Sequence, residues 1–386
     1  MKFLFVANTS WSLYNFRLGL MSALKEKGLN IVFCAPYDGY AEELRGRGYE
    51  YIPIRIDRKG MNPLKDLKLI FNLYKIYHRE KPDLVLHFTI KPNIYGSIAA
   101  KLARVKCINT VTGLGYVFIK EGLLSKFVKF LYKVSFKFPE KIFFQNKDDL
   151  EIFLKNKIIN SENKAILVKG SGINTDYFSP NFCERIKKTK TDFVFLFIGR
   201  FLWDKGIGEL AEAAKILKEK YPSVRFWLLG SIDKGNPSAI PEKKIKEWQN
   251  SALLEFFGEK SDVRPFICRS DCVVLPSYRE GIPRSLLEAA SMGKAIITTN
   301  SSGCKDVVDD GINGFLVPLR DSGALADAMV KMIELTGERR REMGRHGRIK
   351  ILEGFSEKDV TDIYSKTIRE IKPKLKDVAP TEFKRG

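Results

Sequence analysis

Two glutamates whose spacing could serve chemistry, Glu280 and Glu288, lie in the segment SYREGIPRSLLEAASMG, residues 277–293. Pro283 suits the first turn of a helix and Ser285 can help cap one, so the segment predicts a helix start. Glu280 would lie on the entering loop and Glu288 in the second turn. Backbone N–H groups at such a start bind a diphosphate readily. We therefore predict an anion-binding site from these positions: Gly281, Ile282, Pro283, Arg284 and Ser285.

A pair of cations follows the apolar segment FVFLFIG, residues 193–199. Arg200 and Lys205 come directly after this predicted strand, where both could meet the same anion. The alternatives are a surface cation pair here and, for the glutamates, solvated carboxylates favoured by the helix dipole. A glycosidase also uses paired carboxylates, as acid and base, but it has no use for the anion site. Together the four residues outline a nucleotide-sugar site.

The E-x7-E motif and the R-x4-K after a strand resemble the donor half of the retaining glycosyltransferases of family 4, which have the two-domain GT-B fold. KGSGINTDYFSP (169–180) is similar to the N-G-V-D crossover signature of that family, and GCKDVVDDGINGFLV (303–317) to its late strand-turn-strand. Three more segments are similar to a narrower group, the bacterial N-acetylgalactosaminyltransferases that extend undecaprenyl-diphosphate-linked sugars such as N,N'-diacetylbacillosaminyl-diphospho-undecaprenol. These segments are NFRLGLMSALKEKG (15–28), TVTGLGYVF (110–118) and LYKVSFKFPEKIFFQN (131–146).

The resemblance implies a role for each charged residue. Glu288 would bind the ribose hydroxyls and Glu280 the hydroxyls of the donor sugar, while Arg200 and Lys205 would stabilise charge on the departing diphosphate. Retention would follow from attack on the same face, with the leaving phosphate accepting the proton, so no protein nucleophile is expected. No metal or other cofactor is expected either, because no Asp-x-Asp or His cluster is placed to hold a metal.

The N-terminal half departs from the family pattern where many members have His in T-V-H-G, because this chain has Thr112 there. The contact with the donor sugar would then pass to Thr112 or to the N–H groups of Gly113 to Gly115. His87, at the end of the predicted strand DLVLHF, is a second candidate, and a structural role is its favoured alternative.

The first loop, ANTSWSLYNFR (7–17), carries three further candidates for contact with the acceptor or a donor phosphate. These are Asn8, Asn15 and Arg17, for which helix capping and a surface ion remain open alternatives. The loop lacks G-x-G-x-x-G, and the chain lacks G-x-x-x-x-G-K-[ST], which argues against a dehydrogenase and a P-loop NTPase.

The elements that must position these residues alternate between short apolar runs and amphipathic ones, which predicts parallel sheets. At 386 residues with 44% hydrophobic content, the chain suits two cores. The alternation predicts two doubly wound, Rossmann-like α/β domains, and the family resemblance implies that they form the GT-B architecture and face a central cleft. The domains are an acceptor-binding domain (1–183) and a nucleotide-sugar-binding domain (184–366), followed by a tail (367–386).

The net charge of +20 is concentrated in residues 1–190, where 33 Lys and Arg face 17 Asp and Glu, a balance of +16. Such a field fits nucleic acid, an anionic membrane or a diphosphate-bearing lipid. No run of 18 uncharged apolar residues occurs and the N-terminus is no signal peptide, so we expect a cytoplasmic protein. The six cysteines have no metal-ligand spacing and are expected to be free buried thiols, with a disulfide or zinc framework as the alternative: Cys34, Cys107, Cys183, Cys268, Cys272 and Cys304.

The segment LLSKFVKFLYKVSFKF (123–138) predicts a basic amphipathic helix near 123–137. Its basic stripe is Lys126, Lys129, Lys133 and Lys137, and its expected apolar face is Leu124, Phe127, Leu131, Val134 and Phe138. Such a helix can lie in a membrane interface. The alternative is a helix that packs its apolar face on the sheet and leaves its lysines in water.

Together with these observations, the resemblance implies a retaining glycosyltransferase that moves an N-acetylhexosamine, with GalNAc favoured, from UDP to a polyprenyl-diphosphate-linked sugar. It would act peripherally at the cytoplasmic face of the inner membrane. The alternatives are another UDP-hexose, a soluble acceptor or a basic nucleic-acid-binding protein, although no stacking aromatics can be placed for the last, and we expect no nucleic-acid partner.

Overall fold

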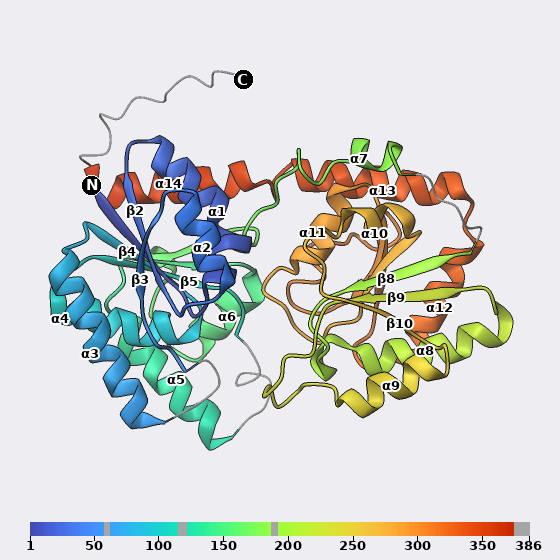
Figure 1. Ribbon diagram of the computed structural model, residues 1–386, viewed down its shortest axis with the longest axis horizontal. Coiled ribbons are helices and arrows are strands. Elements are labelled where there is room, and N and C mark those ends of the chain that lie inside the picture. The colour runs from blue at the N-terminus through green and yellow to red at the C-terminus, as the bar shows by residue number, and fades with distance from the viewer. Residues whose placement is uncertain (58–61, 115–121, 187–191, 374–386) are drawn as a thin grey trace. The chain divides into compact units, whose positions relative to one another are not determined.

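A computed structural model of the chain describes residues 1–57, 62–114, 122–186 and 192–373 (Figure 1). The chain forms two compact units. The first unit comprises Met1–Gly172 together with the chain from Glu357 onward, and the second unit comprises Ile173–Ser356.

The first unit is built on a parallel sheet of order β3-β2-β1-β4-β5-β6-β7. Its central strands are buried on both faces, as expected of strands covered by helices on either side. In register, Phe5 pairs with Phe33 on one side and with Leu86 on the other. The strands are β1 (Lys2–Val6), β2 (Asn30–Ala35), β3 (Glu50–Pro53), β4 (Leu84–Phe88), β5 (Cys107–Val111), β6 (Lys141–Phe144) and β7 (Ala165–Leu167).

Helices cover both faces of this sheet, so two core clusters form. One face carries α3 (Pro63–Glu80), the π-helix η1 (Pro92–Gly96), α4 (Ser97–Ala103), α5 (Leu123–Ser135) and α6 (Lys147–Lys155). The other carries α1 (Ser10–Glu26), α2 (Gly39–Gly46) and α14 (Glu357–Ile371). A short 3₁₀ helix, η3 (Glu162–Lys164), precedes β7.

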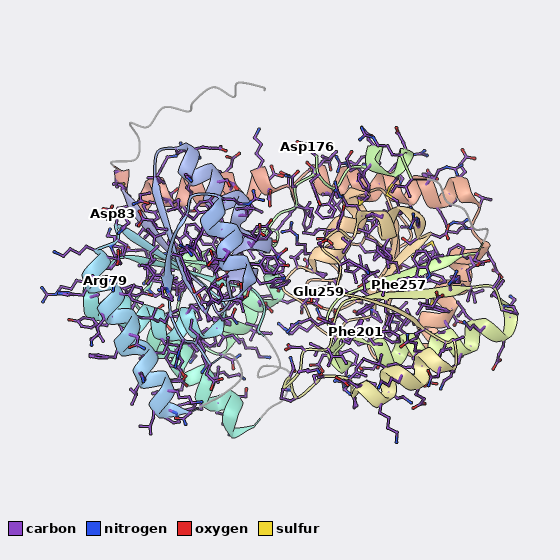
Figure 2. All side chains as sticks on the ribbon, in the orientation of Figure 1. Arg79, Asp83, Asp176, Phe201, Phe257 and Glu259 are labelled. Atoms are coloured by element: carbon purple, nitrogen blue, oxygen red, sulfur yellow. A yellow bond between two sulfur atoms is a disulfide. The ribbon has the colours of Figure 1, made fainter. Side chains whose placement is uncertain are left out.

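The second unit has a parallel sheet of order β10-β9-β8-β11-β12-β13. Phe201 and Glu259 follow β8 and β10 at the carboxyl edge of this sheet (Figure 2). The strands are β8 (Val194–Ile198), β9 (Arg225–Leu229), β10 (Glu255–Gly258), β11 (Cys272–Leu275), β12 (Ala295–Thr299) and β13 (Gly314–Val317). The helices are α7 (Asn181–Glu184), η4 (Trp203–Lys205), α8 (Ile207–Lys220), α9 (Glu242–Asn250), α10 (Arg264–Arg269), α11 (Arg284–Ser291), α12 (Ser322–Glu334) and α13 (Gly337–Leu352).

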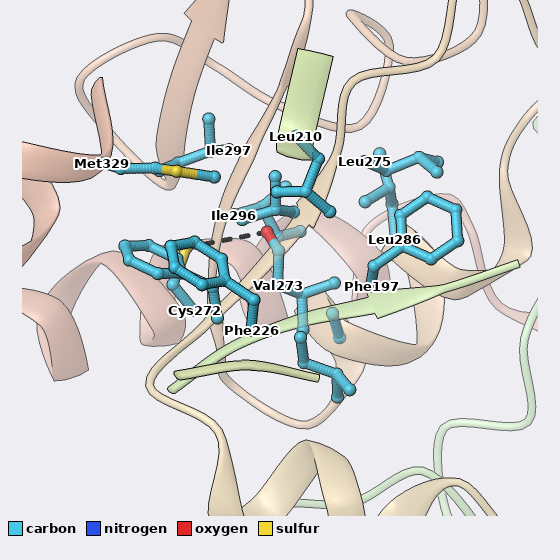
Figure 3. Packing of buried hydrophobic residues seen from close by; sticks show 14 of the residues in the cluster. Phe197, Leu210, Phe226, Cys272, Val273, Leu275, Leu286, Ile296, Ile297 and Met329 are labelled. Carbon is cyan, nitrogen blue, oxygen red and sulfur yellow. Dashed lines mark hydrogen bonds between the residues drawn. The ribbon is translucent and has the colours of Figure 1, made fainter. Parts of the chain in front are cut away.

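One core fills the second unit between its sheet and helices (Figure 3). Leu210 from α8 and Leu286 from α11 are buried there with Val273 and Ile296 of neighbouring strands. This packing fixes the helix starts that follow β8 and β11, and those starts carry the residues with chemical potential.

The last helix lies in the first unit, whereas the sequence-based division placed residues up to 366 in the C-terminal domain. Val360, Tyr364 and Ile368 recur every four residues of α14 and are buried against the first unit's core. The Tyr364 ring stacks on Phe143 with centroids 3.9 Å apart, and its hydroxyl lies 2.8 Å from Thr110 Oγ1. The boundary between the two units also falls after Gly172, whereas the sequence-based division placed it after residue 183.

The expectation of six free thiols is wrong for two cysteines. Cys183 of α7 and Cys268 of α10 form a disulfide, with their Cα atoms 5.0 Å apart. The two helices pack together although the cysteines are 85 residues apart in sequence, so spacing along the chain could not reveal the pair. The other four cysteines are free and buried, and burial raises the pKa of each thiol.

Candidate active site

The predicted cations and glutamates of the second unit follow two strands at the point where the strand order reverses. β8 and β11 are neighbours, while the chain runs outward from β8 to β10 on one side and from β11 to β13 on the other. In open parallel sheets, ligands bind outside the carboxyl ends of the strands at such a reversal. Arg200 and Lys205 follow β8, and Glu280 follows β11, so this position favours a ligand site.

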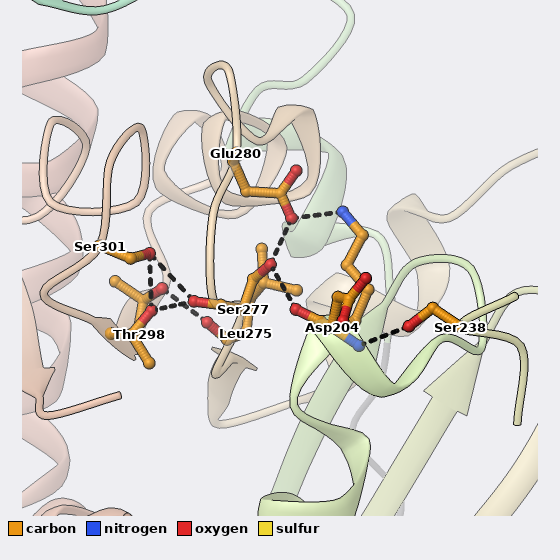
Figure 4. Close-up of polar contacts among 9 residues, drawn as sticks. Asp204, Ser238, Leu275, Ser277, Glu280, Thr298 and Ser301 are labelled. Atoms are coloured by element: carbon orange, nitrogen blue, oxygen red, sulfur yellow. Dashed lines mark hydrogen bonds and ion pairs between the residues drawn. The ribbon is translucent and has the colours of Figure 1, made fainter. Parts of the chain in front are cut away.

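Lys205 and Glu280 form an ion pair at this edge (Figure 4). Their side chains are only 18% and 14% exposed, so the pair is largely enclosed. Ser277 Oγ lies 2.7 Å from the same carboxylate oxygen, Glu280 Oε1. A carboxylate held by an ammonium and a hydroxyl has a fixed orientation, as a binding group requires.

The loop that carries Glu280 is clamped by close backbone contacts that need glycine. A Cβ at Gly206 would lie 2.1 Å from the Pro276 carbonyl oxygen, and one at Gly303 would lie 2.1 Å from the Gly281 oxygen. Both glycines also have positive φ, at +72° and +79°. A larger residue at either position would displace the loop and with it the Glu280 carboxylate.

Three hydroxyl groups of the neighbouring segment bond to the chain at Leu275 and Ser277, two of them to the Ser277 carbonyl oxygen. Ser301 donates to the Ser277 carbonyl oxygen at 3.0 Å and Thr299 donates to the same oxygen, while Thr298 donates to the Leu275 carbonyl at 2.6 Å (Figure 4). This network ties the end of β11 to the end of β12.

Arg200 extends toward solvent and not into this network. Its side chain is 55% exposed, and Nη1 lies 2.7 Å from Asp233 Oδ2, whose own side chain is 13% exposed. Arg200 and Lys205 thus follow the same strand but are held by two different carboxylates.

Helix α11 begins one residue later than the sequence suggests. Pro283 occupies the N-cap and has no side-chain capping bond, so Ser285 lies inside the first turn and does not cap the helix. Glu288 lies in the second turn, as predicted, and its carboxylate accepts from Arg284 Nε at 3.2 Å. Burial raises the pKa of Glu288 to about 7, although the Arg284 guanidinium opposes this shift.

The strand order of the first unit also reverses, between β1 and β4. Arg17, on the helix after β1, is 4% exposed, and its guanidinium lies 4.6 Å from the centroid of the Phe88 ring at the end of β4. The surface-ion alternative for Arg17 is therefore wrong. Asn15 Nδ2 donates to the Trp11 carbonyl within the same helix at 2.9 Å, while Thr9 caps that helix by accepting from Ser12 N.

Thr112 and Gly113 follow β5 at the same edge of the first sheet and are partly buried. Gly113 has φ +123°, a conformation that a residue with a side chain rarely adopts. Residues 115–121 of the loop lie outside the described residues, and they include Gly115, the last of the predicted N–H donors.

His87 is structural. It is fully buried, its Nδ1 lies 2.9 Å from Asn109 Oδ1, and its Nε2 lies 2.9 Å from the Tyr77 hydroxyl. Since an amide oxygen only accepts, Nδ1 carries the proton and Nε2 accepts from Tyr77. Burial lowers the pKa of His87 to about 4, so the ring stays neutral.

The basic helix is present as α5, but its apolar residues divide differently from the prediction. Val128, Tyr132 and Phe136 face the core, whereas Phe127 and Phe130 are 48% and 60% exposed. Three residues of the expected apolar face are only partly buried and belong wholly neither to the side facing the core nor to the side facing solvent: Leu131, Val134 and Phe138. Lys126, Lys133 and Lys137 are exposed, and Lys129 is partly buried. The helix therefore has a second apolar face turned toward solvent.

Sequence reasoning missed Ser277 and Asp233. Ser277 lies three residues before Glu280 in the same predicted loop, and this short spacing could have identified it. Asp233 follows a different strand, β9, and no local pattern links it to Arg200.

Across the described residues, no helix has both the length and the apolar composition needed to cross a bilayer. In the same part of the chain, no group of three or more His, Cys, Asp or Glu side chains is arranged to hold a metal ion.

Two known sequence families match successive parts of the chain. Residues 179–350 match the family described as glycosyl transferases group 1, and residues 2–146 match the family described as glycosyl transferase 4-like.

Two curated relatives align over most of the chain. The N,N'-diacetylbacillosaminyl-diphospho-undecaprenol alpha-1,3-N-acetylgalactosaminyltransferase of Campylobacter jejuni is 32% identical over 86% of this chain and 90% of its own length. The UDP-Gal:alpha-D-GlcNAc-diphosphoundecaprenol alpha-1,3-galactosyltransferase of Escherichia coli is 29% identical over 77% of this chain and 78% of its own.

Two solved structures share the fold. HepE of Anabaena, in complex with UDP-glucose, aligns with a TM-score of 0.79 at 18% identity, over 96% of this chain and 100% of that one. A glycosyltransferase from Rickettsia africae aligns with a TM-score of 0.77 at 21% identity, over 97% and 99%.

Proposed function

The chain belongs to the family 4 glycosyltransferases and has the GT-B fold, and from this premise we propose that it moves an N-acetylhexosamine from UDP to a polyprenyl-diphosphate-linked sugar. The observation that carries the proposal is the enclosed Lys205–Glu280 pair beside the start of α11, at the strand reversal of the second unit.

The proposed chemistry forms a bond between an acceptor hydroxyl oxygen and C1 of the donor sugar while the bond from C1 to the diphosphate breaks. Negative charge develops on the leaving UDP, and fixed positive charge at that position lowers the barrier. An ammonium has three N–H donors and a guanidinium five. Lys205 and Arg200 can therefore each hold a carboxylate partner and a phosphate oxygen together.

We assign the two glutamates to hydroxyl recognition. Glu280 is fixed by Lys205 and Ser277, which suits a group that orients the donor sugar better than one that attacks it. Glu288 keeps acceptor sites beyond its bond to Arg284 for the ribose hydroxyls. With no carboxylate assigned as nucleophile, we propose same-face attack with retention, in which the leaving phosphate takes the acceptor proton.

The names of the two curated relatives support the acceptor class, since both include a sugar on undecaprenyl diphosphate. GalNAc is the favoured donor sugar because the relative with 32% identity is named for it. Galactose is the second candidate, because the Escherichia coli relative is named for UDP-Gal. We propose peripheral action at the cytoplasmic membrane face, which the exposed Phe127 and Phe130 beside the lysines of α5 support.

A donor panel tests the proposal. The purified protein is incubated with UDP-GalNAc, UDP-GlcNAc, UDP-Gal or UDP-Glc and a short polyprenyl-diphosphate-linked sugar, and UDP release and product mass are measured. UDP-GalNAc is expected to give the highest kcat/KM, with the product anomer matching the donor by NMR. Preference for UDP-Gal would move the assignment to galactosyl transfer, and an inverted anomer would refute retention.

A further inference from the structure

Helix α3 exposes an apolar stripe that its own packing in the first unit leaves uncovered. Leu64, Leu67 and Phe71 are 77%, 62% and 54% exposed, and their spacing places them on one side of the helix. The opposite side, with Leu69, Leu73 and others, fills the core. Single exposed apolar side chains are common in proteins, whereas a row of three on one helix face marks an interaction surface.

The exposed charged side chains that α3 itself contributes beside this stripe are positive. Lys65, Lys68 and Lys75 are exposed, and Lys75 Nζ lies 4.4 Å from the centroid of the Phe71 ring. Asp66 is the one acid in residues 63–79; it is buried and held by Lys91 at 2.6 Å and by the Tyr95 hydroxyl at 2.8 Å. Asp57, which precedes the helix, pairs with Lys65 at 3.2 Å, so the exposed side of α3 presents the apolar stripe with one paired lysine and two further lysines, Lys68 and Lys75.

Helix α5 continues the same surface chemistry. Phe127 and Phe130 are exposed among lysines, and residues 123–139 contain no Asp or Glu. Both helices pack against η1 and bury residues in one core cluster, so they cover the same face of the first sheet (Figure 1). Their outward sides thus belong to one side of the first unit.

We propose that α3 and α5 together form a two-helix surface that docks on an anionic membrane, with the α3 stripe entering the interface. Exposed leucine and phenylalanine flanked by lysine match the headgroup region, where apolar side chains reach acyl chains and ammonium groups meet lipid phosphates. A second copy of this surface would place lysines against lysines, which disfavours self-association. The inference rests on the membrane-held acceptor of the proposed function and adds a helix that the sequence pattern did not single out.

The test is vesicle binding by a triple variant, Leu64→Ser with Leu67→Ser and Phe71→Ser. We expect its partition onto vesicles containing phosphatidylglycerol to fall at least about tenfold, because three apolar side chains no longer enter the interface. The matched control is Ile216→Ser with Ile349→Ser and Leu352→Ser, whose side chains in the second unit are 48%, 49% and 49% exposed. The control should bind as the wild type does, and circular dichroism melts should show that both variants fold.

Two further measurements separate this surface from the proposed function. Transfer to a short-chain acceptor in free solution should be unchanged in the α3 variant, whereas the apparent KM for an acceptor embedded in vesicles should rise. If the α3 variant binds vesicles as the wild type does, the proposed surface is refuted. It is also refuted if the variant changes from dimer to monomer by light scattering without losing vesicle binding. If the wild type transfers no sugar but binds vesicles through α3, the proposed function fails and the surface stands.

Discussion

The two units handle their charges in opposite ways. In the second unit, Lys205 and Glu280 are paired, enclosed and held by a hydrogen-bond network, and Glu288, with its side chain 12% exposed, pairs with Arg284. In the first unit, Lys126 and Lys133 project into solvent from a helix that has no acid. An enclosed pair fixes the positions of a few atoms, whereas exposed lysines create a field that attracts without fixing geometry. Under the proposed function, the donor would bind at fixed positions in the second unit, whereas the membrane would be attracted by a diffuse field from the first.

The largest effect should come from breaking the fixed pair. We predict that Lys205→Ala lowers kcat/KM at least about 100-fold, because a lost contact to a developing charge costs roughly 3 kcal/mol. Removing the ammonium also frees the Glu280 carboxylate from one of its two holders. Steady-state kinetics with the preferred UDP-sugar measures the loss, and thermal melts check the fold.

The matched control for that variant is Lys215→Ala. Lys215 also pairs with a glutamate, Glu212, but both side chains are more than half exposed. Exposed pairs contribute little, so we expect less than about a twofold change. Equal losses in the two variants would contradict the assignment of Lys205 to the donor site.

The basic stripe of α5 should show a smaller loss, in membrane binding and not in catalysis. Replacing Lys126, Lys129, Lys133 and Lys137 with Gln should weaken binding to anionic vesicles at least about tenfold, since each basic residue adds up to about 1 kcal/mol near anionic lipid. Added salt should reproduce this effect, because the attraction is screened within about 8 Å at physiological ionic strength. The KM for the UDP-sugar should barely change. If neither added salt nor the substitutions change vesicle binding, the first unit does not act through a diffuse positive field, and its contrast with the enclosed pair of the second unit fails.

Much of the second unit follows from its sequence. The apolar run FVFLFIG, residues 193–199, predicts a strand, and β8 occupies Val194–Ile198 within it. Glu288 falls in the second turn of its helix because Pro283 allows few other helix starts. Local pattern was sufficient where a residue's place depends on its neighbours in the chain.

Sequence patterns did not predict contacts between residues that are far apart in the chain. Asp233 reaches Arg200 from another strand, Cys183 meets Cys268 across 85 residues, and α14 returns to the first unit. The apolar face of α5 was misassigned because a helix rich in Phe has apolar residues on both sides, so periodicity alone cannot say which side packs. For the same reason the outward stripe of α3 was not recognised.

The titration of Glu288 gives a third, more moderate effect. Its pKa of about 7 means that the carboxylate loses its charge as pH falls from 8 to 6, and a protonated carboxyl accepts hydroxyl protons less well. We expect the UDP affinity of the wild type, measured by calorimetry, to fall as pH is lowered from 8 to 6. This fall should exceed the fall in the Glu288→Gln variant by up to about tenfold. That variant has no such titration but retains the titration of the nucleotide's own phosphates.

The sign for stability is the opposite of the sign for binding. The unfolded chain releases the Glu288 proton near the usual pKa of 4.5, whereas the folded chain retains it up to about 7. This group therefore favours the folded state at low pH, and its contribution is lost as pH rises from 4.5 toward 7. A UDP affinity that is equally pH-dependent in the wild type and Glu288→Gln would place the titration elsewhere.

The smallest expected effect is that of chelation. If Lys205 and Arg200 supply the positive charge for the leaving diphosphate, a divalent cation has no required role, and excess EDTA should change kcat by less than about twofold. The informative arm is the combination with Lys205→Ala, because added Mg²⁺ or Mn²⁺ could then take over part of the lost charge. Rescue of the variant by metal, with a wild type indifferent to EDTA, would mean that the ammonium acts chiefly as a fixed charge. A wild type that stops in EDTA and recovers on titration with Mg²⁺ would instead show that the enclosed pair is insufficient, and the contrast between the two units would lose its chemical basis.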